Sequence, residues 1–157
     1  MSAVVDEERL EAFARKMLPR FAQVEVNRQD PIVLILLNRY RRQWGLAPGP
    51  VSGDGWLGLT FDGKLVLVYC EKRLGTVAIV ENVCPANSRY GRLAVYVLML
   101  LYRMAYANGV LTGLLCSVLN SNVPMQTALV RVFGDVGEVD ENGKPVPHGL
   151  IFKLGAV

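Results

Sequence analysis

The sequence predicts an α/β fold in which a mixed, mostly antiparallel sheet is flanked by about four helices. Two segments with apolar residues at helical spacing open the chain, and Asp62-Gly63 then separates two apolar runs, as in a β-hairpin. A long apolar segment with helical spacing comes next, followed by short runs typical of strands. With 157 residues, 52% of them apolar, one domain can bury a core without disulfides or metals.

Two helices are expected before the first strand. Apolar residues recur at helical spacing over residues 6–18, with acidic residues at the start and basic residues toward the end. A second helix is expected from Asp30, which can cap it, with Pro31 at the first helical position, to about Trp44. Residues 47–54, rich in proline and glycine, then form a loop.

Three strands are expected after this loop. Residues 56–61 and 65–70 flank the Asp62-Gly63 turn and are predicted to pair antiparallel. Residues 75–83 are rich in β-branched and apolar side chains and predict a third strand.

The rest of the chain predicts a long helix, a strand, a short helix and a final hairpin. The pair Asn108-Gly109 is typical of a helix that closes in the left-handed conformation. In chain order, these elements are expected at residues 92–107, 110–118, 124–133, 136–139 and 150–154. We interpret residues 1–157 as one domain, with a helical part at 1–46 and the strands and the binding core at 56–157.

Several classes of protein are disfavoured by composition. No apolar run reaches the roughly 18 residues of a membrane span, and acidic residues occupy the N-terminus where a secretory signal would be basic. The three cysteines, Cys70, Cys84 and Cys116, show no Cys-x-x-Cys spacing, so we expect reduced thiols and no metal site. A cytoplasmic protein without a membrane partner is therefore expected.

The charge is uneven along the chain. The net charge of +3 is too small to indicate nucleic-acid binding by itself, but residues 82–134 contain no acidic side chain. The same stretch holds Arg89, Arg92, Arg103 and Arg131, so a ligand bound there is expected to be anionic. Ordinary surface arginines would explain the pattern equally well.

The most distinctive motif joins the third strand to the long helix. A valine-rich strand end is followed by Pro85 and then by the run Arg89-Tyr90-Gly91-Arg92-Leu93-Ala94. This resembles the GNAT superfamily of acyl-CoA N-acyltransferases, in which Arg or Gln-x-x-Gly-x-Gly or Ala opens the long helix. The order of elements from Trp56 onward is similar as well. The resemblance is divergent, because Arg92 stands where the family has its middle glycine.

The resemblance implies that acetyl-CoA or another acyl-CoA is the cosubstrate, and the physics of the motif suits a pyrophosphate. A turn at a helix N-terminus directs several N–H groups and the positive end of the helix dipole toward one point. Either the turn is shifted by one residue to Gly91, or Arg92 contacts phosphate directly, or the turn no longer binds a ligand. The residues expected to bind the cofactor are Val83, whose backbone polarises the thioester, and Arg89, Tyr90, Gly91, Arg92, Leu93, Ala94 and Asn122.

Candidates for the chemistry are few. Many family members have a catalytic tyrosine four residues before the glycine that closes the short helix, and here that position is Val130. Glu81, near the end of the third strand, is the best candidate base, although a solvated strand residue is an equally simple interpretation. His148 lies in a turn and has no indicated partner. Asn122 could cap the short helix instead of binding a ligand.

Two functions therefore remain open. The first is transfer of an acetyl or short acyl group to the amine of a small molecule or protein. The second is a GNAT-fold protein that has lost catalysis and acts as a structural or interaction module with itself or an assembly partner. Small divergent members of the superfamily occur in bacteriophages, including virion proteins, so a phage source and a virion location are compatible with the second function.

Overall fold

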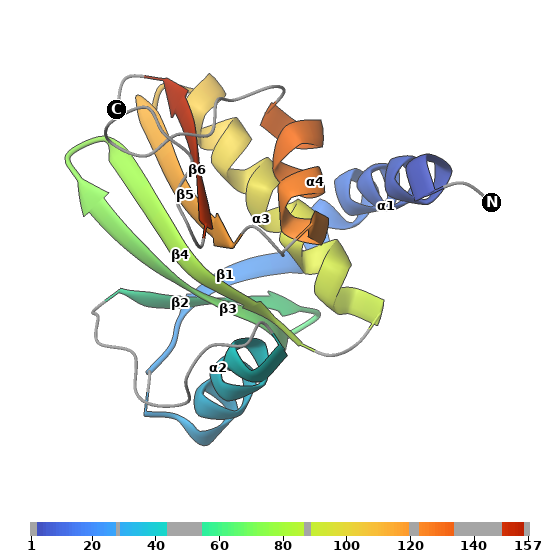
Figure 1. Ribbon diagram of the computed structural model, residues 1–157, viewed down its shortest axis with the longest axis vertical. Helices are drawn as coiled ribbons and strands as arrows, with labels where there is room; N and C mark the ends of the chain where they lie inside the picture. The colour runs from blue at the N-terminus through green and yellow to red at the C-terminus, as the bar shows by residue number, and fades with distance from the viewer. Residues whose placement is uncertain are drawn as a thin grey trace.

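Four α-helices and six strands make up the part of the chain that the computed structural model describes (Figure 1), residues 3–27, 29–43, 55–86, 89–119, 123–133 and 149–155. In chain order the elements are α1 (Ala3–Met17), a 3₁₀ turn (Leu18–Arg20), β1 (Phe21–Glu25), α2 (Pro31–Gln43), β2 (Trp56–Phe61), β3 (Lys64–Leu74), β4 (Val77–Pro85), α3 (Arg89–Ala107), β5 (Gly113–Leu119), α4 (Val123–Phe133) and β6 (Gly149–Gly155).

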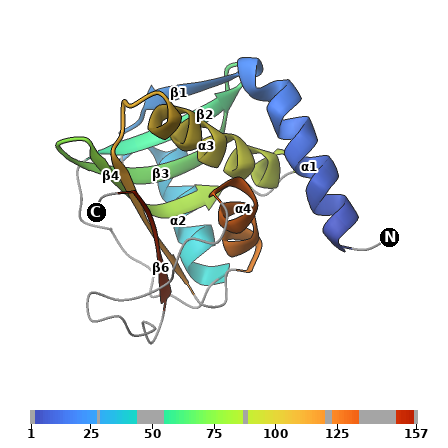
Figure 2. The same ribbon diagram turned by 90° about the horizontal axis from the view of Figure 1, so that it is seen from above.

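The described strands form one sheet in the order β1-β2-β3-β4-β5-β6. Only the β4–β5 pair is parallel within it, which confirms the predicted mixed, mostly antiparallel sheet. Helices α1, α3 and α4 lie on one face and α2 lies on the other (Figures 1 and 2). The crossover from β4 to β5 through α3 explains why these two strands run parallel.

Each face of the sheet has its own apolar core. The larger core centres on α3, where Leu93, Val97 and Leu98 are buried against the sheet. On the other face, the buried residues of α2 are Val33, Leu36 and Leu37, whose helical spacing produces one apolar stripe. The sheet is thus covered on both sides, with α2 packed against β3 and β4.

Local signals correctly predicted several element ends. The side-chain oxygen of Asp30 accepts a hydrogen bond from the Ile32 N–H at 3.1 Å, which confirms the expected helix cap. Asp62 and Gly63 have φ values of +52° and +86°, as a two-residue hairpin turn requires. Gly109, with φ of +75°, follows α3 in the left-handed conformation.

The Asp62 turn is also fixed by charge. Arg20 donates two hydrogen bonds to the Asp62 carboxylate, one of them from Nε to Oδ1 at 2.9 Å, and these bonds lower the pKa of Asp62. A lowered folded-state pKa means that the pair stabilises the fold above the usual aspartate pKa and loses this contribution as the pH falls through the folded value. We expect Asp62→Asn to lower the urea midpoint near neutral pH but not in strong acid. An equal decrease at both pH values would contradict this account.

One strand was missed and several boundaries were wrong. No strand was predicted over Phe21–Glu25, because five residues after a proline carry little period-two signal; pairing with β2 stabilises this strand. Helix α3 begins at Arg89, three residues before the expected start, and β3 continues to Leu74 because its pairing with β4 extends that far. Strand β5 begins at Gly113, after the chain leaves the α3 cap. The expected strand at 136–139 lies outside the described residues.

The structure supplies two further limits. None of the described helices is both long and apolar enough to cross a membrane. Among the described residues, no three His, Cys, Asp or Glu side chains are grouped so that they could hold a metal ion.

Candidate functional site

A bulge in β4 shapes the site. Val68 of β3 pairs with Cys84, while Cys70 pairs with Glu81, so that two residues of β4 lie opposite a single residue of β3. Asn82, one of the two, has φ of +53°, the left-handed conformation that asparagine tolerates well. Such a bulge bends its strand and re-aims the side chains that follow.

The parallel pair β4–β5 ends just before this bulge. Its register runs from Val77 opposite Gly113 to Val80 opposite Cys116, although β4 continues to Pro85 and β5 to Leu119. Beyond Val80, therefore, the β4 backbone has no ladder partner on the described part of β5. An extended molecule placed there could bond to the free edge of β4.

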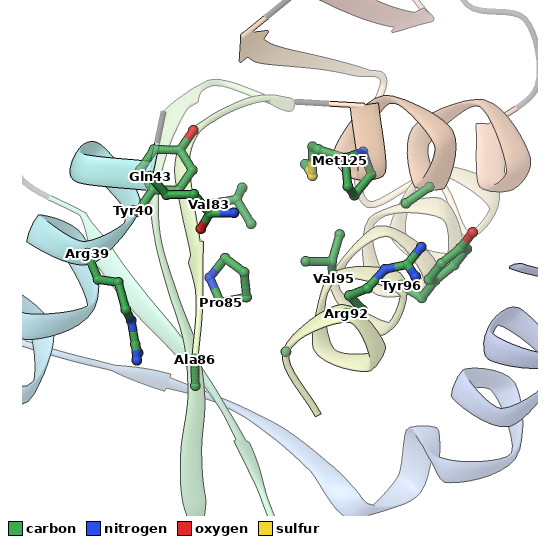
Figure 3. A pocket seen from close by; sticks show the side chains of 13 residues that line it. Arg39, Tyr40, Gln43, Val83, Pro85, Ala86, Arg92, Val95, Tyr96 and Met125 are labelled. Atoms are coloured by element: carbon green, nitrogen blue, oxygen red, sulfur yellow. The ribbon is translucent and has the colours of Figure 1, made fainter. Parts of the chain in front are cut away.

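A cavity of about 560 Å³ lies beside this edge (Figure 3). That volume is in the range of sites for drug-sized ligands and cofactors. The described side chains and backbone that line it come from α2, the end of β4, the first two turns of α3 and the start of α4: Arg39, Tyr40, Gln43, Val83, Pro85, Ala86, Gly91, Arg92, Val95, Tyr96, Pro124, Met125 and Ala128.

The cavity has distinct walls and ends. Figure 3 shows the α2 side chains on one side and those of α3 and α4 on the other, with the end of β4 between them. Along β4, Tyr40 lies at the Val83 end, whereas Arg39 extends toward the Ala86 end. The wall is largely apolar between these polar groups, with Val95 and Met125 contributed by α3 and α4.

Gly91 lets the N-terminus of α3 approach the end of β4. A Cβ atom at this position would overlap the backbone carbonyl oxygen of Ala86 and lie 3.3 Å from the Cβ of Pro85. The first turn of α3 contains no acidic residue, so its N–H groups and dipole are not neutralised from within the helix. The cavity is therefore bordered by a helix N-terminus suited to an anion, with the cavity-lining Arg92 beside it.

This close approach predicts a cost for Gly91→Ala. Alanine is favoured over glycine in a helix by about 1 kcal/mol, but overpacking against a fixed backbone group costs about 1–3 kcal/mol. Since a backbone carbonyl cannot rotate away as a side chain can, we expect a net decrease in the free energy of unfolding, measured by urea denaturation. A variant as stable as the wild type would show that the α3 N-terminus can move away from β4.

The residues predicted from the motif do not all reach the cavity. Val83, Gly91 and Arg92 line it, whereas the side chains of Leu93 and Ala94 are buried in the core beneath α3. Leu93 and Ala94 could therefore contribute to binding only through their backbone.

Tyr90 faces away from the cavity toward Phe61, at the end of β2. Its ring stacks on Phe61, with the ring centroids 5.1 Å apart. The structure describes the backbone of Arg89 but not its side chain, and Asn122 and His148 lie outside the described residues.

Glu81, the candidate base, and Val130, which occupies the position of the family's catalytic tyrosine, both lie outside the cavity lining that the structure describes. Glu81 is exposed on β4 next to the bulge, and it opposes Cys70 on β3. Burial raises the pKa of Cys116 to about 12, with a smaller contribution from the Glu81 charge, so this thiol is not a nucleophile. Val130 is 42% exposed on α4.

The positive charge at the cavity is only partly compensated. Arg92 donates a hydrogen bond to Glu7 of α1, and the Tyr96 hydroxyl donates to the other oxygen of that carboxylate. Arg39, by contrast, forms no ion pair with any residue that the structure describes. The α2 wall therefore carries the less compensated cation.

The sequence motif did not indicate the α2 side of the site. Arg39, Tyr40 and Gln43 share one side of the helix, and the basic second half of α2 was visible in the sequence. That this side faces the end of β4 depends on how the helix packs on the sheet, which the local pattern does not specify.

No family model and no curated protein sequence matches this chain. Solved structures do. The GNAT domain of PAT from S. lividans aligns with a TM-score of 0.60 and 12% identity, covering 87% of this chain and 89% of that one. A GNAT family acetyltransferase from Elizabethkingia anophelis, solved with acetyl-CoA bound, aligns at 0.53 and 14%, covering 87% and 99%.

The ribosomal-protein-S18-alanine N-acetyltransferase from Escherichia coli aligns with a TM-score of 0.54 and 15% identity, covering 86% of this chain and 93% of that one. These matches span nearly the full length of both chains, and their low identity restricts the conclusion to the fold. The chain has the fold of the GNAT acetyltransferases.

Proposed function

We propose that this chain is a single-domain N-acyltransferase that binds acetyl-CoA or another short acyl-CoA in the cavity and transfers the acyl group to an amine. The observation that carries the proposal is the convergence, at one cavity, of the unpaired edge of β4 and the N-terminus of α3. The first suits the amides of a pantetheine arm, and the second suits a pyrophosphate.

The phosphate end of the ligand is assigned to the Ala86 end of the cavity. There the N–H groups of the first turn of α3, Gly91 included, accompany the guanidinium groups of Arg92 and Arg39. A negatively charged phosphate can compete with Glu7 for Arg92, whose side chain is 52% exposed. The motif residues from Arg89 to Ala94 then act mainly through backbone and helix dipole.

The thioester is assigned to the Val83 end. A pantetheine arm that follows β4 from Ala86 toward the bulge passes the apolar side chains of Pro85, Val95 and Met125. At the bulge the backbone of Val83 can polarise the thioester carbonyl, as the family resemblance implies, so that an amine attacks there. Glu81, exposed beside the bulge, is the candidate base for the incoming ammonium group.

The acceptor is an amine of a small molecule or protein. The test is calorimetric titration of the purified chain with acetyl-CoA, followed by a screen of amines in which release of CoA is measured. Saturable binding at one site with amine-dependent release supports the proposal. An absence of binding would sink it and leave the alternative of a GNAT-fold structural or interaction protein, including a virion component.

A further inference from the structure

Helix α1 contacts the site through one carboxylate group. Glu7 accepts a hydrogen bond from the Arg92 guanidinium at one oxygen and from the Tyr96 hydroxyl at the other. Both donors are among the described residues that line the cavity, whereas Glu7 is not. The Glu7 side chain is only 12% exposed, so its carboxylate is held between these two partners. The cation at the start of α3 is thus paired with a residue from outside the cavity lining.

This contact holds Arg92 away from the position proposed for the phosphates. Figure 3 shows the Arg92 side chain directed away from β4, with its guanidinium next to the Tyr96 ring. The phosphate position proposed above lies toward Ala86, at the end of β4. The Arg92 side chain is 52% exposed, so it can change rotamer without disturbing the core. Arg92 therefore has two alternative anionic partners, Glu7 on α1 and a phosphate in the cavity.

The rest of α1 is held independently of this contact. One turn after Glu7, Glu11 accepts a hydrogen bond from Nε of Arg131 on α4 at 3.1 Å, and Arg131 is not among the described lining residues. Ala14 is completely buried, and Leu10 packs against the larger core. Loss of the contact between Glu7 and Arg92 is therefore expected to free the arginine while α1 stays in place.

We propose that Glu7 restrains Arg92 and so lowers the affinity of the site for acyl-CoA, because the phosphates must displace this contact when they bind. The inference rests on the proposed function. Coupling between two contacts is reciprocal, so the ligand weakens the contact between α1 and α3 by the same factor by which that contact weakens the ligand. Glu7 is in this account a positioning residue, which acts on the ligand only through Arg92.

The test is calorimetric titration with acetyl-CoA at one fixed salt concentration. Glu7→Gln keeps the size of the side chain and an oxygen that can accept from Tyr96, but it removes the charge that pairs with Arg92. Glu11→Gln is the matched control, because it makes the same change one turn later at a carboxylate paired with Arg131. Glu7→Gln is also made in an Arg92→Gln background, which shows whether the effect passes through Arg92.

We expect Glu7→Gln to tighten acetyl-CoA binding by about three- to tenfold, at or above the contribution of a fully exposed ion pair because Glu7 is largely buried. Glu11→Gln is expected to leave the Kd within about twofold of the wild type, since charges away from the cavity are screened. In the Arg92→Gln background, Glu7→Gln should change the Kd by less than about twofold.

Three results would overturn the inference while the proposed function stands. Weaker binding by Glu7→Gln would show that Glu7 orients Arg92 toward the ligand instead of holding it away, and an unchanged Kd would show that the contact is not displaced. Equal tightening by Glu7→Gln and Glu11→Gln, or tightening that persists without Arg92, would indicate a general effect of charge. If neither the wild type nor Glu7→Gln binds acetyl-CoA, the proposed function fails and the inference fails with it.

Discussion

Reversing the charge of Arg39 is expected to weaken acetyl-CoA binding by about 10- to 100-fold, because a hydrogen bond to a charged group contributes about 1.5–3 kcal/mol. Arg39 lines the cavity and has no ion-pair partner among the described residues, so its charge is available to a phosphate. Arg39→Glu and Arg92→Glu are compared with the wild type by calorimetry at one fixed salt concentration.

The matched control is Arg103→Glu, which makes the same change on α3 at a residue that does not line the cavity. A second control is needed because Arg92→Glu also places a negative charge next to Glu7. Exchanging the two charges, Glu7→Arg with Arg92→Glu, keeps an ion pair between α1 and α3 and is still expected to bind more weakly. Equal losses in Arg103→Glu and Arg39→Glu would indicate a general effect of net charge rather than a site.

The second large effect is expected at the centre of α3. Leu98 is completely buried, so Leu98→Ala is predicted to lower the free energy of unfolding by about 2–5 kcal/mol through lost burial and the cavity left behind. Met104 lies on the same helix and is 46% exposed, so Met104→Ala should change the stability by no more than about 0.5 kcal/mol.

Urea denaturation measures both variants. Similar stabilities for Leu98→Ala and Met104→Ala would mean that α3 does not pack on the sheet through the face described above. The comparison matters for the site, because α3 carries Gly91 and Arg92 at its N-terminus.

The elements that the sequence predicted well have local causes. The hairpin follows from Asp62 and Gly63, which tolerate positive φ, and the start of α2 follows from the cap at Asp30. Strand β1 has no such signal, because its stability comes from pairing Phe21 with Phe61 across forty residues of chain. Short edge strands of this kind are specified by their partner rather than by their own composition.

Only part of the site was predicted, because the direction of each side chain depends on where the helix begins. The motif was interpreted as a continuous run, but once residues 89–94 lie in a helix, successive side chains point in different directions around its axis. Hence Gly91 and Arg92 line the cavity, Tyr90 contacts Phe61, and Leu93 enters the core. Starting the helix three residues earlier would have allowed this division to be predicted from spacing alone.

The α2 wall could not have been predicted in the same way. Arg39 and Tyr40 lie in a helix on the opposite face of the sheet from α3. They line the cavity because the sheet is open there, beyond the last pair of β4 with β5. The bulge at Asn82 could not be predicted either, because a single left-handed residue in a strand produces no recognisable sequence pattern. Both features are decided by packing across the sheet.

The most direct test of acyl-CoA binding at this cavity is an amide NMR titration of the isotope-labelled chain with acetyl-CoA. The account predicts saturable shifts at Val83, Gly91, Arg92 and Met125, which line the cavity, with little change at β1 on the far edge of the sheet. Shifts confined to residues away from the cavity, or none at millimolar ligand, would contradict it.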